Sequence, residues 1–373
     1  MRLSRFATLS LALVCACSHT DAFVYQSSDI GPRSNGADVL LTQNDINYWP
    51  TLSEDGSAVL YAYIDESEGT VRPLNQFEQP PLGVFPLHVH RCMGAMRVAG
   101  GTRFWEFCDN RTSEIESLNS FPAFAMGADG RLLYIESVGS RKFPFAALGV
   151  ALWLADSAAP FRRTQLATLP VVVGDSTINW IADIQWTGPA TFLALGQKLT
   201  LTAHCACSAN DSAFAGQQLI RGTISGGVAT LAALSGAAGA TAYAVVDNGA
   251  SIVFTRADNA NLLKIPVAGG TPAVAASNVA PGGRQVLGLS CRDARCVVAT
   301  GFVPSGGTSD LRSVSLATGV VATLFSSSQT ISVPLLTASG DVIAQVGSGF
   351  GRVRTFAATT LRLHLYKGLF PAS

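Results

Sequence analysis

Two histidines one residue apart, His88 and His90, lie in an apolar run that favours a β-strand. Alternate residues of a strand point to the same face, so the two imidazoles form a workable pair of metal ligands. A later stretch, AHCACSAND at 203–211, offers His204 and two thiols as further ligands. The competing interpretation is a solvated strand face, with the thiols withdrawn into a disulfide. His88, His90 and His204 are therefore the metal-ligand candidates, and no resident cofactor is predicted.

Two charged stretches are candidates for catalysis or recognition. Asp65, Glu66 and Glu68 sit together where the chain reads as a loop, and a solvated charged loop explains them equally well. The stretch SRKFPF at 140–145 mixes cations with aromatic rings, a combination enriched at binding surfaces. Its binding candidates are Arg141, Lys142, Phe143 and Phe145, and ordinary loop packing is the alternative.

Sequence motifs for covalent or metal-dependent catalysis are missing. No Gly-x-Ser-x-Gly elbow, His-Glu-x-x-His pair, P-loop or Cys-x-x-Cys motif occurs in the 373 residues. We therefore predict no catalytic residue.

The N-terminus resembles a bacterial lipoprotein signal. A short basic region is followed by the apolar run FATLSLALVCA at 6–16, which is too short to cross a bilayer. Val14, Cys15 and Ala16 then precede Cys17 as in a lipobox, and this resemblance implies acylation of Cys17 and anchoring by its acyl chains. The serine after Cys17 implies the outer membrane, while ordinary signal cleavage is the competing interpretation. The predicted divisions are 1–16 signal peptide, 17–37 lipidated N-terminus and linker, and 38–373 one folded domain.

The remaining cysteines fit two hairpins of an exported protein. Eight cysteines less Cys15 and Cys17 leave six, an even number. A two-residue turn at 293–294 places Cys291 opposite Cys296 in a non-hydrogen-bonded pair, where side chains come closest. A three-residue turn at 99–101 places Cys92 opposite Cys108 by the same arithmetic. Cys205 and Cys207 are left either joined to each other or free.

The bulk composition favours one large all-β domain. Hydrophobic residues make up 48% of the chain and charged residues 13%, with 36 glycines and 17 prolines. Basic and acidic residues number 25 each, and no basic run follows the N-terminus, so nucleic acid is not expected as a partner. The uncharged segment 222–246 is punctuated by glycine like strand-turn-strand, which predicts two buried strands and a loop, not a membrane helix.

Repetition along the chain predicts how these elements are arranged. NYWPTLSEDGSAVLYAY at 47–63 is echoed by SFPAFAMGADGRLLYIE at 120–136, and weaker copies follow. Each copy has two apolar runs around a tight turn, as in a hairpin, and a second hairpin such as VAGGT (98–102 and 267–271) lies between copies. The first-hairpin turns are centred near Gly56, Gly130, Gly188, Gly249, Ala294 and Gly340. In the last unit, AATT at 357–360 is the candidate second turn. About six four-stranded antiparallel units predict a six-bladed β-propeller.

The repeat also resembles the TolB-like six-bladed propeller family. Proline, an Asp-Gly turn, an apolar run with tyrosine and a Gly-Gly-Thr hairpin carry the resemblance over roughly residues 38–370. The family's Ser-Pro-Asp-Gly core is intact nowhere, since Ser53-Glu54-Asp55-Gly56 lacks the proline. The large N-terminal α/β domain of TolB itself has no counterpart here, so the resemblance implies the propeller fold and not TolB's role.

Insertions point to one end of the ring as the functional end. The connections between the second and third strands are longest in the first three units, which predicts loops at 64–86, 137–149 and 196–217 on one face. The leading hypothesis is a monomeric, non-catalytic, envelope-anchored propeller that presents this face to an envelope protein or glycan. The alternative is a lactonase-like or glycan-cleaving hydrolase with an acidic or metal site at the central channel.

Overall fold

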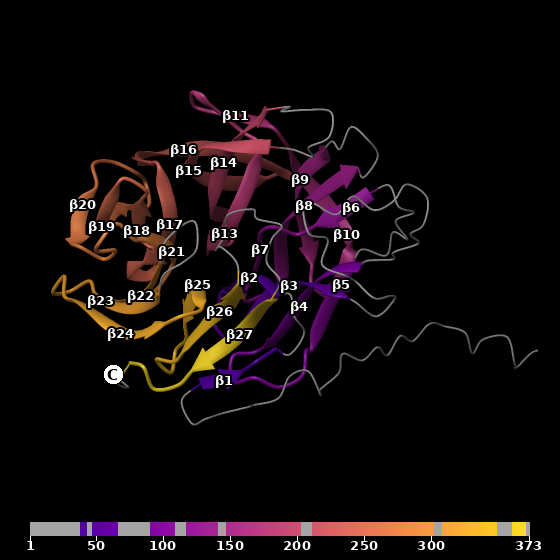
Figure 1. Ribbon diagram of the computed structural model, residues 1–373. Coiled ribbons are helices and arrows are strands. Elements are labelled where there is room, and N and C mark those ends of the chain that lie inside the picture. Colours follow the sequence, from indigo (N-terminus) through magenta and orange to yellow (C-terminus); the bar gives the residue numbers. More distant parts are fainter. Residues whose placement is uncertain are drawn as a thin grey trace, which may run out of the picture.

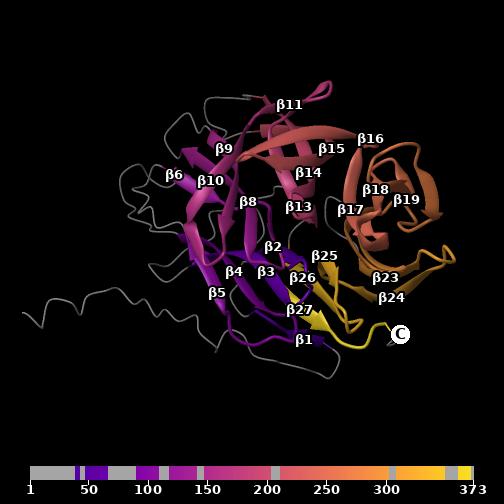
Figure 2. The ribbon, with the colours of Figure 1, turned by 180° about the vertical axis from the view of Figure 1, so that it is seen from behind.

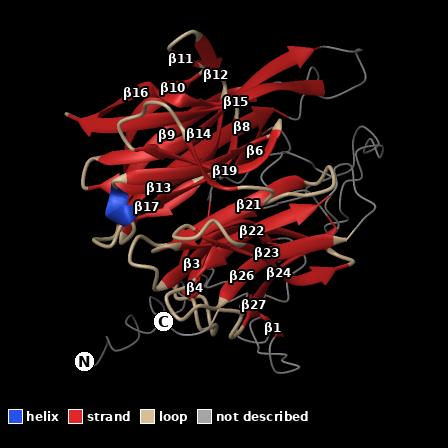
Figure 3. Cartoon of the chain, turned by 90° about the vertical axis from the view of Figure 1, so that its left-hand side faces the viewer, coloured by secondary structure: helices blue, strands red, loops and turns tan. Residues whose placement is uncertain are grey.

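The computed structural model describes residues 38–42, 47–65, 90–108, 117–140, 147–202, 211–301, 308–348 and 360–370. In this part of the chain nearly all regular structure is β-strand, and Figure 3 shows a single helical turn at Asp247–Gly249. The predicted all-β fold class is therefore confirmed.

Six antiparallel sheets follow one another around a ring (Figure 1); five have four strands, and the second has five because its first strand is divided into β6 and β7. The first blade contains β2 (Asn47–Leu52), β3 (Ala58–Asp65), β4 (His90–Arg97) and β5 (Trp105–Cys108). The second contains β6 (Ser117–Ser120) with β7 (Phe124–Met126), then β8 (Arg131–Ser140), β9 (Ala147–Asp156) and β10 (Ala159–Leu169). The third contains β13 (Trp180–Gly188), β14 (Thr191–Thr202), β15 (Asp211–Ser225) and β16 (Val228–Ala238).

The remaining blades continue the pattern. The fourth contains β17 (Ala240–Val246), β18 (Ser251–Arg256), β19 (Asn259–Pro266) and β20 (Ala273–Ala276). The fifth contains β21 (Gln285–Arg292), β22 (Arg295–Gly301), β23 (Ser309–Ser315) and β24 (Val321–Ser327). The sixth contains β25 (Thr330–Leu336), β26 (Val342–Ser348), β27 (Thr360–Tyr366) and β1 (Asp38–Leu40). This is a six-bladed β-propeller, as the repeat predicts.

The ring is closed by a strand from the other end of the chain. β1 pairs antiparallel with β27, and Figure 1 shows the indigo strand beside the yellow one. The predicted second hairpin at 357–360 is wrong, because Thr360 already begins β27 and the fourth strand of the last blade is β1. Figure 2 shows the same closure from behind. The first and last parts of the domain therefore hold each other in place.

The tight turns form as predicted because glycine supplies the backbone angles that they need. Gly56 has φ 69° and Gly130 has φ 85°, values that strain residues with a side chain. In the fifth blade Asp293 takes φ 54° in the turn that places Cys291 opposite Cys296. We call the end of the ring that carries these first-to-second-strand turns the turn end, and the opposite end the insert end.

The prolines of the repeat mark a distortion of the innermost strands. Pro50 and Pro334 lie in register shifts of β2 and β25, and Pro122 separates β6 from β7. The innermost strand has one unpaired edge, so a residue without an N–H group is tolerated there. Trp49 and Val333, each directly before a proline, take φ 49° and 46°, a region that bulky residues rarely enter. Equivalent shifts without proline occur in β13, β17 and β21.

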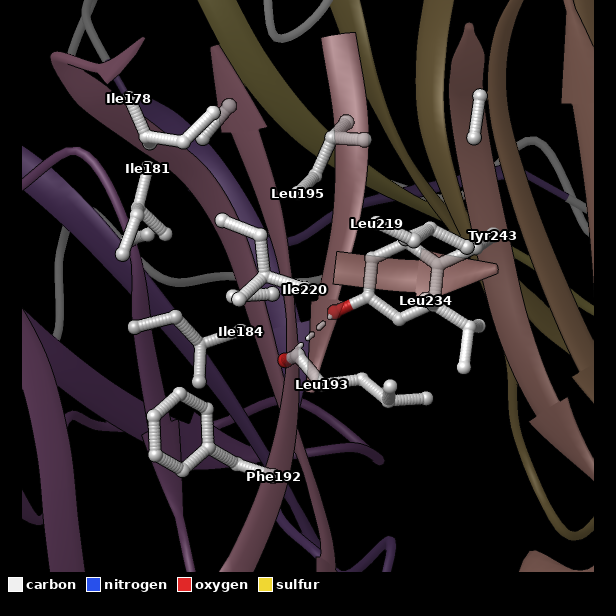
Figure 4. Close-up of a cluster of buried hydrophobic side chains, with 14 of the residues drawn as sticks. Ile178, Ile181, Ile184, Phe192, Leu193, Leu195, Leu219, Ile220, Leu234 and Tyr243 are labelled. Atoms are coloured by element: carbon white, nitrogen blue, oxygen red, sulfur yellow. Dashed lines mark hydrogen bonds between the residues drawn. The ribbon is translucent and has the colours of Figure 1, made fainter. Parts of the chain in front are cut away.

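The core lies between the blades and combines aliphatic with aromatic side chains. Figure 4 shows the cluster around the third blade, where Leu193, Leu195, Leu219 and Ile220 interdigitate. Tyr243, on the first strand of the fourth blade, donates its hydroxyl to the Leu193 carbonyl at 3.0 Å, so one polar group in this core is satisfied across a blade interface.

The uncharged segment 222–246 forms strands, as predicted, but one of them is not buried. It spans the end of β15, then β16, then β17. β16 is the outer strand of its blade, and Val228 at its start is 60% exposed. A short extra hairpin, β11 (Val171–Val173) with β12 (Ser176–Ile178), precedes this blade and has no counterpart in the repeat. No helix in the described residues is long and apolar enough to cross a membrane.

Candidate functional site

Most of the residues that the sequence suggests for function lie outside the described part of the chain. They are Cys17, Glu66, Glu68, His88, Arg141, Lys142, Phe143, Phe145, His204, Cys205 and Cys207. His90 is the first residue of β4, and its backbone pairs with Asp65 at the end of β3. The metal, lipid and recognition roles assigned to these residues therefore remain predictions.

Two of the three predicted insert loops are in large part β-strand in the structure. Of the predicted loop 137–149, residues 137–140 belong to β8 and 147–149 to β9. Of the predicted loop 196–217, residues 196–202 belong to β14 and 211–217 to β15, with Thr202 paired to Asp211. Much of the added chain therefore lengthens two hairpins in place of forming loops.

These hairpins share one end of the ring. Second strands of successive blades run in the same direction, so β3, β8 and β14 all end at the insert end. Backbone pairing continues along the extension of β14 and β15, which gives the third blade a ladder of twelve register pairs between these two strands. Paired strands hold their connecting residues in a more definite place than an unpaired loop of the same length.

The innermost strands offer little for a carboxylate-based reaction. Among the described first strands of the blades, Asp183 on β13 is the only acidic residue, and it is 5% exposed. Polar contacts between the inner strands of the first and last blades are neutral: the Trp49 N–H donates to Gln345 Oε1 at 3.2 Å, and Gln345 Nε2 donates to Ser332 Oγ at 3.2 Å. This amide joins the first and last blades.

Charged side chains tie three consecutive blades together at the turn end. The Glu54 carboxylate accepts from the Ala128 N–H at 3.0 Å, which joins the first turns of blades one and two. Arg131 stacks on the Trp186 ring at 4.5 Å and donates to the Pro189 carbonyl, which joins blades two and three. The same guanidinium lies 4.0 Å from Glu54. Because these side chains contact one another and the backbone of the next blade, the cluster holds neighbouring blades together.

Two acids of these turns are held in their ionised form. Hydrogen bonds from the Ser53 hydroxyl and the Ser57 backbone lower the pKa of Asp55. A hydrogen bond from Arg131 lowers the pKa of Asp129, whose Oδ2 lies 2.5 Å from the arginine Nε. Both carboxylates are exposed and serve the geometry of the Asp-Gly turns.

A buried ion pair lies farther out, on the second blade. Arg163 on β10 donates to Glu136 Oε2 and to the Tyr134 hydroxyl, both at 2.9 Å, while its guanidinium lies 4.0 Å over the Trp153 ring. These contacts join three strands of one blade. Because Glu136 is 5% exposed, removal of Arg163 would leave a buried charge without its partner. A sequence pattern does not predict this group, because its members come from three different strands.

The outer edge of the first blade carries a disulfide beside a carboxylate. Cys92 on β4 is bonded to Cys108 on β5, and the Cys291–Cys296 bridge joins β21 to β22, so both pairings predicted from hairpin register are present. Glu106 Oε1 lies 3.1 Å from Cys108 Sγ. Arg103 lies 3.5 Å from the other oxygen of Glu106 and 4.1 Å over the Tyr63 ring.

Comparison with known proteins supports the fold and leaves the activity open. No protein-family model and no curated protein matches the sequence. Among solved structures, the NanB sialidase from Streptococcus pneumoniae aligns with a TM-score of 0.50 and 9% identity, over 90% of this chain and 71% of that one. A putative gluconolactonase aligns at 0.48 and 13% identity, over 93% and 95% of the two chains. The β-propeller domain of the Trilobed protease from Pyrococcus furiosus aligns at 0.42 and 9% identity, over 87% and 96%.

These likenesses concern the arrangement of strands, because identities of this size carry no residue correspondence. They include a sialidase, a protein described as a putative gluconolactonase and the propeller domain of a protease. The blade count, the strand order and the closure by β1 define the class of this protein as a six-bladed β-propeller. The finer likeness to TolB-like repeats stays a prediction from the sequence.

Proposed function

We propose that this chain is a non-catalytic, envelope-anchored propeller whose insert end binds a protein or glycan partner. The observation that carries the proposal is the extension of the β8–β9 and β14–β15 hairpins on neighbouring blades, next to the blade that holds the 66–89 insertion. The chain is longer in three consecutive blades at one end of the ring, and connections carried on a rigid scaffold are a usual platform for recognition.

The partner test compares the two ends of the ring. In one variant a two-residue Asn-Gly turn replaces 141–146 and 203–210, which shortens both hairpins without touching the ring. A control variant carries Thr318→Glu in an exposed turn at the other end. Envelope proteins and glycans retained by the wild type and the control, and lost by the shortened variant, are the expected result. Equal retention by all three would place binding elsewhere.

The anchor is part of the same proposal and has its own test. Growth with a labelled fatty acid should mark the wild-type protein and leave Cys17→Ser unlabelled and released from membranes. Label that persists in the Cys17→Ser variant would overturn the anchor and leave the binding proposal standing.

The hydrolase alternative has less support. Paired carboxylates are the usual requirement for glycan cleavage, and the described innermost strands carry Asp183 alone. Metal analysis of the purified protein separates the two functions: a stoichiometric ion that is lost in His88→Ala would favour the enzyme.

A further inference from the structure

The disulfide between Cys92 and Cys108, together with Glu106, contains the side chains of a metal site in which the two sulfur atoms are bonded to each other. The two cysteines are direct register partners on β4 and β5, and Glu106 precedes Cys108 by two residues, so all three side chains share one face of the ribbon. The two sulfurs and a carboxylate oxygen of Glu106 all lie within 4.8 Å of one another. Cys92 is buried, Cys108 is half-buried and Glu106 is exposed, which leaves an approach from solvent on the glutamate side.

We propose that reduction of this disulfide creates a Zn²⁺ site formed by the Cys92 and Cys108 thiolates and the Glu106 carboxylate. Two thiolates and one carboxylate are ligands that Zn²⁺ accepts, and the fourth tetrahedral position is open to water. The inference is independent of the partner binding proposed above.

The two states of the site exclude each other chemically. A dithiol reductant transfers two electrons and two protons to the bridge, which breaks the S–S bond, yields two thiols and leaves the reductant as its own disulfide. Zn²⁺ then displaces the two thiol protons and forms two Zn–S bonds, while the ionised glutamate supplies an oxygen. A disulfide oxidant accepts two electrons from the thiolates and, with two protons, becomes two thiols; the S–S bond forms again, both sulfur ligands are lost and the ion is released.

Charge around the site suits a dication bound by three anions. Two thiolates and a carboxylate bring three negative charges to Zn²⁺, which leaves a net charge of −1. The Arg103 guanidinium, 3.5 Å from Glu106 Oε2, supplies the balancing positive charge and leaves Oε1 on the sulfur side. Arg103 is itself held over the Tyr63 ring, and such second-layer contacts orient metal ligands. We therefore assign Arg103 as a positioning residue for Glu106.

The second hairpin bridge is a built-in comparison. Cys291 and Cys296 are also direct register partners, but their neighbours along the strands are Arg292 and Arg295. Among the described residues, no carboxylate or histidine joins this pair in a three-ligand group, whereas Glu106 joins the first pair. Reduction of both bridges should therefore produce one metal site and one simple dithiol.

The experiment uses Co²⁺ as a spectroscopic substitute for Zn²⁺. Full-length protein is reduced with a phosphine, which is oxidised to its oxide with oxygen taken from water, and is then freed of reductant without oxygen. The expected result is one Co²⁺ per chain, with thiolate-to-metal charge-transfer absorption and visible bands of tetrahedral cobalt, and displacement by Zn²⁺. Oxidised protein should show none of these bands.

Three variants locate the site. The double variant Cys291→Ser/Cys296→Ser and the double variant Cys205→Ser/Cys207→Ser should keep the cobalt bands. Glu106→Gln should weaken Zn²⁺ binding by about tenfold or more.

Further controls decide the outcome. Arg103→Gln should weaken binding by about tenfold, while Arg97→Gln, which changes a nearby exposed cation, should not. The proposal is overturned if reduced wild type that keeps its far-ultraviolet β-sheet spectrum binds no Co²⁺, or if Cys92→Ser/Cys108→Ser retains the charge-transfer band.

Discussion

Leu41 lies where the N-terminal strand closes the ring, and its truncation should cost more than its position near a chain end suggests. The side chain is 1% exposed and packs with Tyr61 of the first blade and Leu363 of the last. Its backbone N–H donates to the Leu363 carbonyl at 2.7 Å. Leu41→Ala removes three buried carbon atoms, which at about 0.8 kcal/mol each is roughly 2.4 kcal/mol before the cavity is counted. With a partly collapsed cavity the expected loss is about 3 kcal/mol, within the usual range for buried leucines.

The measurement is equilibrium unfolding in urea followed by tryptophan fluorescence, with the denaturant dependence compared between variants. Leu40→Ala is the matched control, because Leu40 is the same residue type one position earlier and only half-buried. It should cost about 1 kcal/mol or less. Thr42→Val tests the same closure through a hydrogen bond, since the Thr42 hydroxyl accepts from the Leu363 N–H at 3.0 Å. If Leu41→Ala and Leu40→Ala shift the unfolding midpoint equally, β1 does not close the ring in solution.

Three further perturbations test other parts of the fold. Replacement of both cysteines of the Cys92–Cys108 bridge by serine should lower the free energy of unfolding by about 3 kcal/mol and leave the fold intact, because the bridge closes a loop with a sequence separation of 16. The same replacement in the Cys291–Cys296 bridge, whose sequence separation is 5, should lower it by about 2 kcal/mol. Urea unfolding checks this, and a larger effect for the shorter loop would contradict the chain-entropy argument. Gly288→Ala should cost about 1 to 3 kcal/mol by thermal or urea unfolding, because the new methyl group would lie 2.6 Å from Pro334 Cδ; an unchanged midpoint would show that the two inner strands are not in contact. Asp55→Asn should lower the free energy of unfolding by less than about 1 kcal/mol at neutral pH, because the lowered pKa of Asp55 stabilises the fold above about pH 4 and this contribution is lost as pH falls through the folded pKa. The unfolding midpoints of the wild type and the variant, measured against pH, should therefore converge in acid. A difference that persists in acid would point to a cause other than ionisation.

Local features of this protein could be read from the sequence because they depend on neighbouring residues. The turn at 293–294 determines by itself that Cys291 faces Cys296, since hairpin register follows from turn length. The same holds for Cys92 and Cys108 across the turn near Gly100. Asp-Gly turns recurring between apolar runs also predict four-stranded units, and six such units can protect their sheet edges by closing into a ring.

Features that depend on contacts between distant segments appear only in the tertiary structure. The pairing of β1 with β27 joins residues more than three hundred positions apart, and nothing in the three-residue strand itself indicates its partner. For the same reason the sequence places a hairpin at 357–360 where the chain needs none. The added length at 137–149 and 196–217 is equally ambiguous in one dimension, because a loop and a longer hairpin have the same residue count.

The prolines of the innermost strands show most clearly the difference between what neighbouring residues determine and what contacts between distant segments determine. Their recurrence is visible in the sequence, but proline normally argues against a strand that is paired on both sides. Only the ring places Pro50 and Pro334 on strands with an unpaired inner edge, where a missing N–H group leaves no partner unsatisfied. Turn chemistry and hairpin register are thus determined by neighbours in the chain, whereas edge exposure, ring closure and contacts such as that of Arg131 with Trp186 are decided when the blades meet.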